Sequence, residues 1–174
     1  MKSFLTYFIF WSLVASNASA DLKNRYTAYV FMGTECPISQ KYVPTLNDIA
    51  QAHPQLTLIG VFSEHLSPSE LDEFRTQFNV NFELVHDPNF EMADRFGAAV
   101  TPEVFLVDQN GTLGYSGAID NWFVSLGRNR LAPNEHYLLD AFNALLGGRK
   151  VQVSKTPAIG CFLERHKPAA HGHH

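Results

Sequence analysis

Apolar runs and amphipathic stretches alternate along most of the chain. Short, mainly apolar runs rich in aromatic and β-branched residues are typical of buried strands, and they occur at 26–32, 56–62, 82–85, 104–107 and 112–119. Apolar residues at helical spacing predict helices that begin at Pro37, at the Ser67–Glu70 capping box, near Asp87 and near Asn134 or Glu135. Gly97 and Gly147 are expected to end the last two of these helices.

The connections between these elements indicate the fold class. Asn110-Gly111 predicts a hairpin turn between the last two strands. Residues 120–133 show no periodicity and are expected to be an irregular loop, and 151–153 are a candidate edge strand. Alternating strands and helices that end in a hairpin predict a single α/β domain, with parallel strand pairs and a final antiparallel pair.

The two ends of the chain have a different composition. Lys2, an apolar stretch and Ala18-Ser19-Ala20 predict a signal peptide over 1–20. The folded domain is then expected over 21–165, with a disordered His-rich tail over 166–174. After cleavage we expect no stable membrane insertion, and the protein is expected in the periplasm or in the secreted fraction.

Charge and cysteine content narrow the function. The chain has 13 Lys and Arg against 17 Asp and Glu, a net charge of −4. This acidic balance argues against nucleic acid as a partner. Export would place Cys36 and Cys161, the only two cysteines, where disulfides persist.

Cys36 is the first candidate for chemistry. It lies between a predicted strand and the helix that starts at Pro37. The unpaired N–H groups of a helix start stabilise a thiolate, so this position favours a reactive cysteine over an inert buried one. Thr101-Pro102 precedes another predicted strand, and a proline there is unusual unless it has a geometric role.

The stretches 29–39 and 101–111 resemble the redoxin, or peroxiredoxin-like, branch of the thioredoxin superfamily. Further matching features are Ile119-Asp120, a Leu-rich helix, and a late Gly160-Cys161. The resemblance implies a thioredoxin-like three-layer sandwich around a central mixed sheet, with a cis bond between Thr101 and Pro102 that faces Cys36. It also implies exchange chemistry at Cys36 without a cofactor, and a substrate site formed by Thr101, Pro102, Glu35 and Pro37.

Three departures from relatives of this fold limit the chemistry. Ser39 stands where a dithiol thioredoxin has its second cysteine. Gly33 stands where a peroxiredoxin has Thr or Ser, and Thr34 is one position too late. Gln40 occupies the position of the second cysteine in copper-carrying relatives.

Cys161 is therefore the candidate partner of Cys36. Pairing would close a long loop and stabilise the fold by about 4–5 kcal/mol in the chain-entropy model. The pair would be either a permanent clasp or a reversible couple, and a free thiol in a flexible tail remains the alternative. The other polar residues have more ordinary explanations: Asp87 as a helix cap, and Asp120, Arg128 and Arg130 as solvated loop residues.

Three functions stay open. The leading hypothesis is an exported thiol–disulfide oxidoreductase that acts on protein thiols or disulfides through Cys36, with Cys161 as the resolving residue and an unidentified reductant. The second is a thiol peroxidase that uses Cys36 on peroxides. The third is a non-catalytic binding or metal-handling module, with Cys36–Cys161 as a structural disulfide. No preformed metal site is predicted, although His166, His171, His173 and His174 could bind Cu or Zn adventitiously.

Overall fold

The computed structural model describes residues 26–163. The predicted signal peptide and the His-rich tail lie outside the described residues. None of the helices within 26–163 has the length and apolar character needed to cross a membrane.

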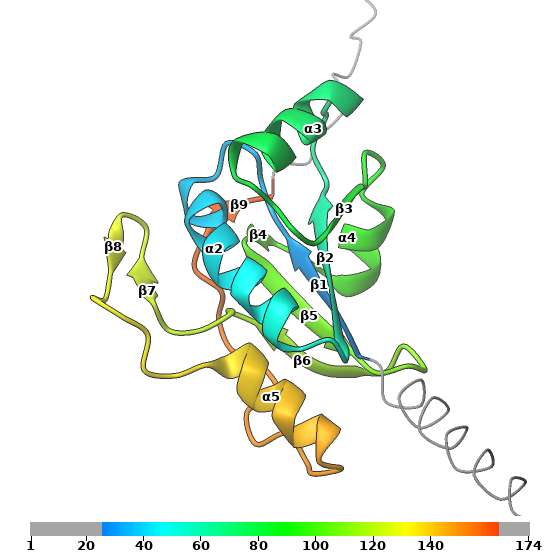
Figure 1. The fold of residues 1–174 in the computed structure, drawn as a ribbon, viewed down its shortest axis with the longest axis vertical. Helices are drawn as coiled ribbons and strands as arrows, with labels where there is room; N and C mark the ends of the chain where they lie inside the picture. The colour runs from blue at the N-terminus through cyan, green and yellow to red at the C-terminus, as the bar shows by residue number, and fades with distance from the viewer. Residues whose placement is uncertain (1–25, 164–174) are drawn as a thin grey trace, which may run out of the picture.

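A five-stranded mixed sheet forms the centre of the molecule, in the order β3-β2-β1-β5-β6 (Figure 1). Its strands are β1 (Tyr26–Phe31), β2 (Leu56–Phe62), β3 (Glu83–His86), β5 (Glu103–Val107) and β6 (Leu113–Gly117). The first three strands pair in parallel, whereas β5 runs antiparallel to both β1 and β6. The predicted parallel pairs and the hairpin at Asn110-Gly111 are confirmed.

Helices cover both faces of this sheet and make three layers. One face packs against α2 (Pro37–Ala52), α3 (Pro68–Gln77) and α5 (Tyr137–Leu146), whereas the other packs against α4 (Glu91–Phe96). Figure 1 shows α2 crossing the front of the sheet. The predicted three-layer α/β sandwich is therefore confirmed.

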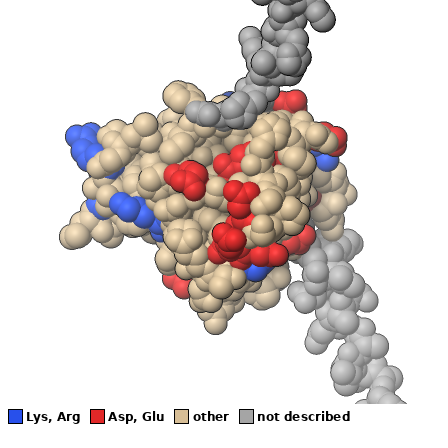
Figure 2. Space-filling model, turned by 90° about the horizontal axis from the view of Figure 1, so that it is seen from above, with Lys and Arg blue, Asp and Glu red and all other residues tan. Residues whose placement is uncertain are grey.

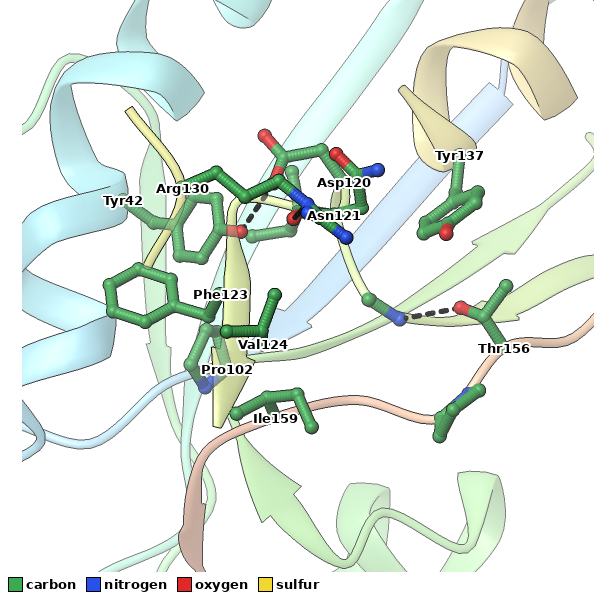
Figure 3. Close-up of a pocket in the computed structure, with 13 residues that line it drawn as sticks. Tyr42, Pro102, Asp120, Asn121, Phe123, Val124, Arg130, Tyr137, Thr156 and Ile159 are labelled. Carbon is green, nitrogen blue, oxygen red and sulfur yellow. Dashed lines mark hydrogen bonds between the residues drawn. The ribbon is translucent and has the colours of Figure 1, made fainter. Parts of the chain in front are cut away.

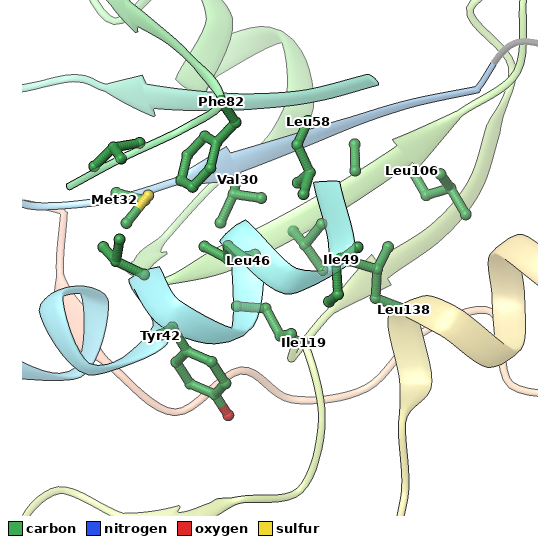
Figure 4. Close-up of a cluster of buried hydrophobic side chains, with 14 of the residues drawn as sticks. Val30, Met32, Tyr42, Leu46, Ile49, Leu58, Phe82, Leu106, Ile119 and Leu138 are labelled. Carbon is green, nitrogen blue, oxygen red and sulfur yellow. The ribbon is translucent and has the colours of Figure 1, made fainter. Parts of the chain in front are cut away.

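The larger core lies between α2 and the sheet (Figure 4). Side chains of α2 at spacings of three and four are buried there: Ile38, Tyr42, Val43, Leu46 and Ile49. This packing holds α2 at a fixed position on the sheet, because a buried amphipathic face stabilises a helix more than its intrinsic propensity does. The start of α2 is fixed with it.

Segments predicted as irregular contain short strands. The loop over 120–133 holds a small hairpin of β7 (Phe123–Ser125) and β8 (Arg128–Asn129). A separate two-stranded sheet joins β4 (Val100–Thr101) to β9 (Cys161–Phe162). The proposed edge strand at 151–153 is wrong: the chain there has no ladder, and pairing to β6 begins at Ser154 and Lys155.

Helix starts also differ from the sequence prediction in detail. The Ser67–Glu70 capping box is present as predicted, but α5 begins two to three residues later than expected. Asp87 caps α4 from further upstream than the N-cap position, since its carboxylate accepts the N–H groups of Met92 and Ala93, both at 3.1 Å. Phe90, with φ of 60°, is the N-cap residue itself.

Candidate active site

Cys36 is the N-cap residue of α2, and its side chain is 4% exposed. Pro37 takes the first helical position, and the first turn contains no acidic residue. The unpaired N–H groups and the positive end of the helix dipole therefore act on the Cys36 sulfur without a competing carboxylate in that turn. This is the environment in which cysteine ionises readily.

Thr101 lies against Cys36, and Pro102 follows it in the chain. The peptide bond between them is cis, as predicted. The Cys36 thiol donates a hydrogen bond to the carbonyl oxygen of Thr101, with 3.0 Å between sulfur and oxygen. Gly33 fits closely beside both residues, since a Cβ there would lie 3.2 Å from Thr101 Oγ1 and 3.3 Å from Cys36 Cβ.

Cys161 reaches the same place through β9. In the antiparallel β4–β9 pair, Cys161 is the register partner of Thr101. The Leu163 N–H extends this pairing by donating to the Ala99 carbonyl oxygen at 3.0 Å. The Cys161 side chain lies within hydrogen-bonding reach of the Cys36 sulfur, and both cysteines are free thiols. The structure thus brings together two residues that are 125 positions apart in the sequence.

The two thiols have opposite acidities. Burial opposes ionisation of Cys36, but hydrogen bonds from the Cys161 thiol and from the backbone and hydroxyl of Ser39 outweigh it and lower the pKa to about 7, from 9.0. Burial raises the pKa of Cys161 to about 11, and the hydrogen bond and charge of Cys36 act in the same direction. At pH 7 about half of Cys36 is therefore thiolate, whereas Cys161 keeps its proton.

A cavity of about 400 Å³ opens onto both sulfurs. Its walls include Glu35, Cys36, Glu64, His65, Thr101, Cys161 and Leu163, and no Lys or Arg. Glu64 is held by the Thr34 N–H at 2.7 Å, whereas Glu35 is exposed. Figure 2 shows acidic side chains gathered in the middle of the face that carries α3, with Lys and Arg towards its edge. The entrance to the thiols is acidic.

The predicted substrate residues do not all line this cavity. Thr101 and Glu35 do, whereas Pro37 is exposed on the first turn of α2 and Pro102 lines a second cavity instead. That second cavity, of about 270 Å³, is drawn in Figure 3. The two residues of the cis bond thus line different cavities.

Asp120 lines the second cavity, and the expectation that it would be solvated is wrong. It is 4% exposed, and it accepts hydrogen bonds from the Tyr42 hydroxyl at 2.5 Å and the Trp122 N–H at 2.8 Å. Burial, and next the hydrogen bond to Asp120, raise the pKa of Tyr42. The other two loop residues, Arg128 and Arg130, are exposed as expected.

Thr156 anchors the segment that carries Cys161. Its Oγ1 accepts from the Ala118 N–H at 3.0 Å and lies 2.6 Å from the Tyr115 hydroxyl. The Thr156 N–H also donates to Ser116 O at 3.0 Å. Gly117 has φ of 132°, and a Cβ on it would lie 2.1 Å from Thr156 O. Only glycine therefore fits at position 117 beside Thr156.

Sequence reasoning missed the parts of the site that depend on tertiary contact. These are Ser39 as a hydrogen-bond partner of Cys36, Tyr42 as the partner of Asp120, and Thr156 as the anchor of the last segment. Ser39 could have been found as a polar residue on the buried face of a helix. Within residues 26–163, no group of three or more His, Cys, Asp or Glu side chains is arranged to hold a metal ion.

Comparison with known proteins agrees with this architecture. A family model described as the AhpC/TSA family matches residues 15–116, more than half of the chain. No curated protein matches the sequence.

Two solved structures of unassigned function are similar over most of their length. An uncharacterized conserved protein from Geobacillus kaustophilus has a TM-score of 0.71 at 23% identity, over 86% of this chain and 82% of that chain. A hypothetical protein from Sinorhizobium meliloti 1021 has a TM-score of 0.69 at 21% identity, over 83% and 82%.

DsbF from MTB, described in mixed oxidized and reduced forms, has a TM-score of 0.54 at 23% identity, over 71% of this chain and 83% of that chain. At these identities the likenesses establish the fold, and the predicted thioredoxin-like architecture is confirmed.

Proposed function

Because the chain belongs to the AhpC/TSA family, within the redoxin branch of the thioredoxin superfamily, we propose that it is a thiol–disulfide oxidoreductase. Cys36 is the nucleophile, and Cys161 is the resolving cysteine. One observation carries the proposal: two free thiols meet beside the cis Thr101–Pro102 bond, with pKa values moved in opposite directions.

The first half-reaction uses the acidity of Cys36. Its thiolate attacks one sulfur of a substrate disulfide, a mixed disulfide forms, and the other substrate sulfur leaves as a thiolate that takes up a proton. With a pKa of about 7, roughly half of Cys36 is thiolate at pH 7. Part of this advantage is offset because nucleophilicity falls with pKa.

The second half-reaction follows from the raised pKa of Cys161. Part of that rise comes from the hydrogen bond and charge of Cys36. Burial is the larger cause, but once Cys36 is in a mixed disulfide it carries no charge, so its part of the rise is lost and Cys161 passes its proton more easily to the substrate sulfur that leaves. The Cys161 thiolate then attacks Cys36 Sγ, a Cys36–Cys161 disulfide forms, and the second substrate sulfur leaves as a thiol. Two electrons have moved to the substrate, and a dithiol reductant must return them.

The remaining predicted residues support this cycle. Thr101 and Pro102 position the substrate segment next to Cys36. Glu35 at the acidic entrance favours substrates without acidic residues near the disulfide, and exposed Pro37 offers an apolar contact beside it. The predicted signal peptide places this chemistry in the periplasm or outside the cell, where protein disulfides are available as substrates.

The test compares three forms of the full chain. With a glutathionylated peptide as the substrate, Cys36→Ser should lose at least about 100-fold in exchange rate, because serine cannot form the mixed disulfide. Cys161→Ser should form the mixed disulfide and stop there, as seen by intact mass. Ser154→Ala, a change outside the site, is the control. An unchanged rate in Cys36→Ser would overturn the proposal.

The same proteins separate the alternative functions. Peroxide consumption by the wild type, in the presence of a dithiol and absent in Cys36→Ser, would favour the thiol peroxidase over disulfide exchange. A Cys36–Cys161 disulfide that forms but does not react with dithiols while the protein is folded would favour a structural clasp.

A further inference from the structure

β9 occupies the edge of β4, a position suited to an extended polypeptide. β4 pairs with β9 alone and belongs to a sheet separate from the central one. Exposed strand edges bind extended segments through backbone hydrogen bonds. In this register, the residue opposite Thr101 is held next to the Cys36 sulfur. A segment that replaced β9 with its own cysteine opposite Thr101 would present that sulfur to Cys36.

β9 is held weakly. It has two residues, and Phe162 in it is 82% exposed. A two-stranded pair of this length is not stable by itself in water. Its supports are the β4 ladder, the bond from Leu163 N–H to Ala99 O, and the packing of Leu163 on the smaller core cluster with Phe31 and Phe105. Segments with so few buried contacts open with a small free-energy cost.

We propose that the edge of β4 docks an extended, cysteine-containing segment of another polypeptide, and that β9 is its internal counterpart, which must leave before substrate docks. This inference rests on the proposed exchange at Cys36. The return of β9 brings Cys161 back to Cys36, so resolution of the mixed disulfide and expulsion of the reduced segment are one event.

The residues in and around β9 also indicate which sequences the edge of β4 would accept. A Cβ on Gly160 would lie 2.1 Å from Thr101 O and 2.5 Å from Thr101 C, so the position before the cysteine admits only glycine without a shift of the strand. The position after the cysteine is exposed, as Phe162 shows, and the next one packs on apolar residues, as Leu163 does. The preferred segment therefore reads glycine, cysteine, any residue, then an apolar residue.

The first experiment tests this preference on the full chain with Cys161→Ser, which stops at the mixed disulfide. The probes are glutathionylated Pro-Ala-Ile-Gly-Cys-Phe-Leu and the same peptide with alanine in place of glycine. The glycine peptide should be captured at least about fivefold faster, because overpacking against the Thr101 backbone is costly. Oxidised 2-mercaptoethanol, too short to pair with β4, measures the reactivity of Cys36 without docking.

The second experiment loosens β9. Adding Gly160→Ala to Cys161→Ser should force β9 away from Thr101 and speed capture of the glycine peptide, without raising the rate with oxidised 2-mercaptoethanol to the same degree. Val153→Ala in the same background is the control, since Val153 is half exposed and lies outside the β4–β9 pair. Circular dichroism checks that each variant is folded.

The outcomes separate this inference from the proposed function. If Cys161→Ser captures neither peptide nor oxidised 2-mercaptoethanol, exchange at Cys36 is wrong. If it reacts with both peptides at one rate, or if Gly160→Ala slows peptide capture while the reaction with the small disulfide is kept, docking on β4 is overturned. Because the peptide comparison does not use Gly160→Ala, it remains decisive even if that variant does not fold.

Discussion

The two cysteines are held by very different parts of the molecule. Cys36 caps a 16-residue helix whose inner face is buried in the main core, and its side chain is 4% exposed. Cys161 lies in a two-residue strand beside an 82% exposed phenylalanine. The nucleophile is therefore held firmly by the main core, whereas its partner lies in a weakly held strand that can move. In an exchange enzyme this is the useful arrangement, because the partner must give way to the substrate and then return.

Joining the two regions should have the largest effect. A Cys36–Cys161 disulfide closes a long loop and should raise the free energy of unfolding by about 4 kcal/mol over the reduced form, in the chain-entropy model. Urea unfolding with and without a dithiol measures the difference, and Cys161→Ser should show none. Equal stability of the oxidised and reduced wild type would contradict this expectation, and would mean that the Cys36–Cys161 disulfide strains β9.

The fixed region was largely predictable from the sequence because local signals define it. An uncharged apolar run, Pro37 and the helical spacing of Ile38, Tyr42 and Leu46 identify the strand, the turn and the helix that place Cys36. Short-range rules of this kind depend on neighbours in sequence. The cis bond at Thr101-Pro102 was predictable from the family resemblance together with the strand order, because a proline before a core strand is otherwise unusual.

The movable region and its surroundings were less predictable. β4 and β9 have two residues each, too few to show periodicity, and their pairing joins segments about 60 positions apart. Asp120 looked like a loop acid because the donors that bury it, Tyr42 and the Trp122 N–H, are identified only in the folded chain. The family resemblance suggested Cys161 as a partner, but the tertiary structure supplies its place opposite Thr101.

The free energy of unfolding of the reduced protein should depend on pH through both thiols, first through Cys36 and, at higher pH, through Cys161. The pKa of Cys36 is about 7 in the folded state against 9.0 in the unfolded chain. The free energy of unfolding therefore rises as the pH rises from 7 to 9, and this contribution of Cys36 is lost as the pH falls through 7. The gain should be about 2 kcal/mol. Above pH 9, the raised pKa of Cys161 acts in the opposite direction, and stability should fall again towards pH 11.

Urea unfolding under a reductant at pH 6, 7.5, 9 and about 10.5 measures this profile. Cys36→Ser is the matched control, because it should remove the rise between pH 7 and 9. A wild-type profile that ran parallel to that of Cys36→Ser would contradict the assignment of the thiolate to Cys36.

A smaller effect is expected from loosening the anchor of Cys161. Thr156→Val removes the hydroxyl that pairs with the Ala118 N–H and the Tyr115 hydroxyl, and should lower the free energy of unfolding by about 1.5 kcal/mol. Alkylation of Cys161 should become faster, because β9 follows the loosened segment. Thr57→Val, at an exposed strand position, should change stability by no more than about 0.5 kcal/mol. Equal effects of the two variants would mean that Thr156 does not hold the segment.

The smallest effect separates the contributions of the two regions to the acidity of Cys36. The side chain of Cys161 makes the largest lowering contribution to the Cys36 pKa, ahead of the backbone and the hydroxyl of Ser39. Cys161→Ala should therefore raise the pKa of Cys36 clearly above 7, and Ser39→Ala should raise it less, since the Ser39 N–H remains. Titration of the thiolate by its ultraviolet absorbance measures both shifts, with Cys36→Ser as the blank. If Ser39→Ala had the larger effect, α2 alone would set the acidity of Cys36, and the movable strand would contribute a resolving thiol but no control over the nucleophile.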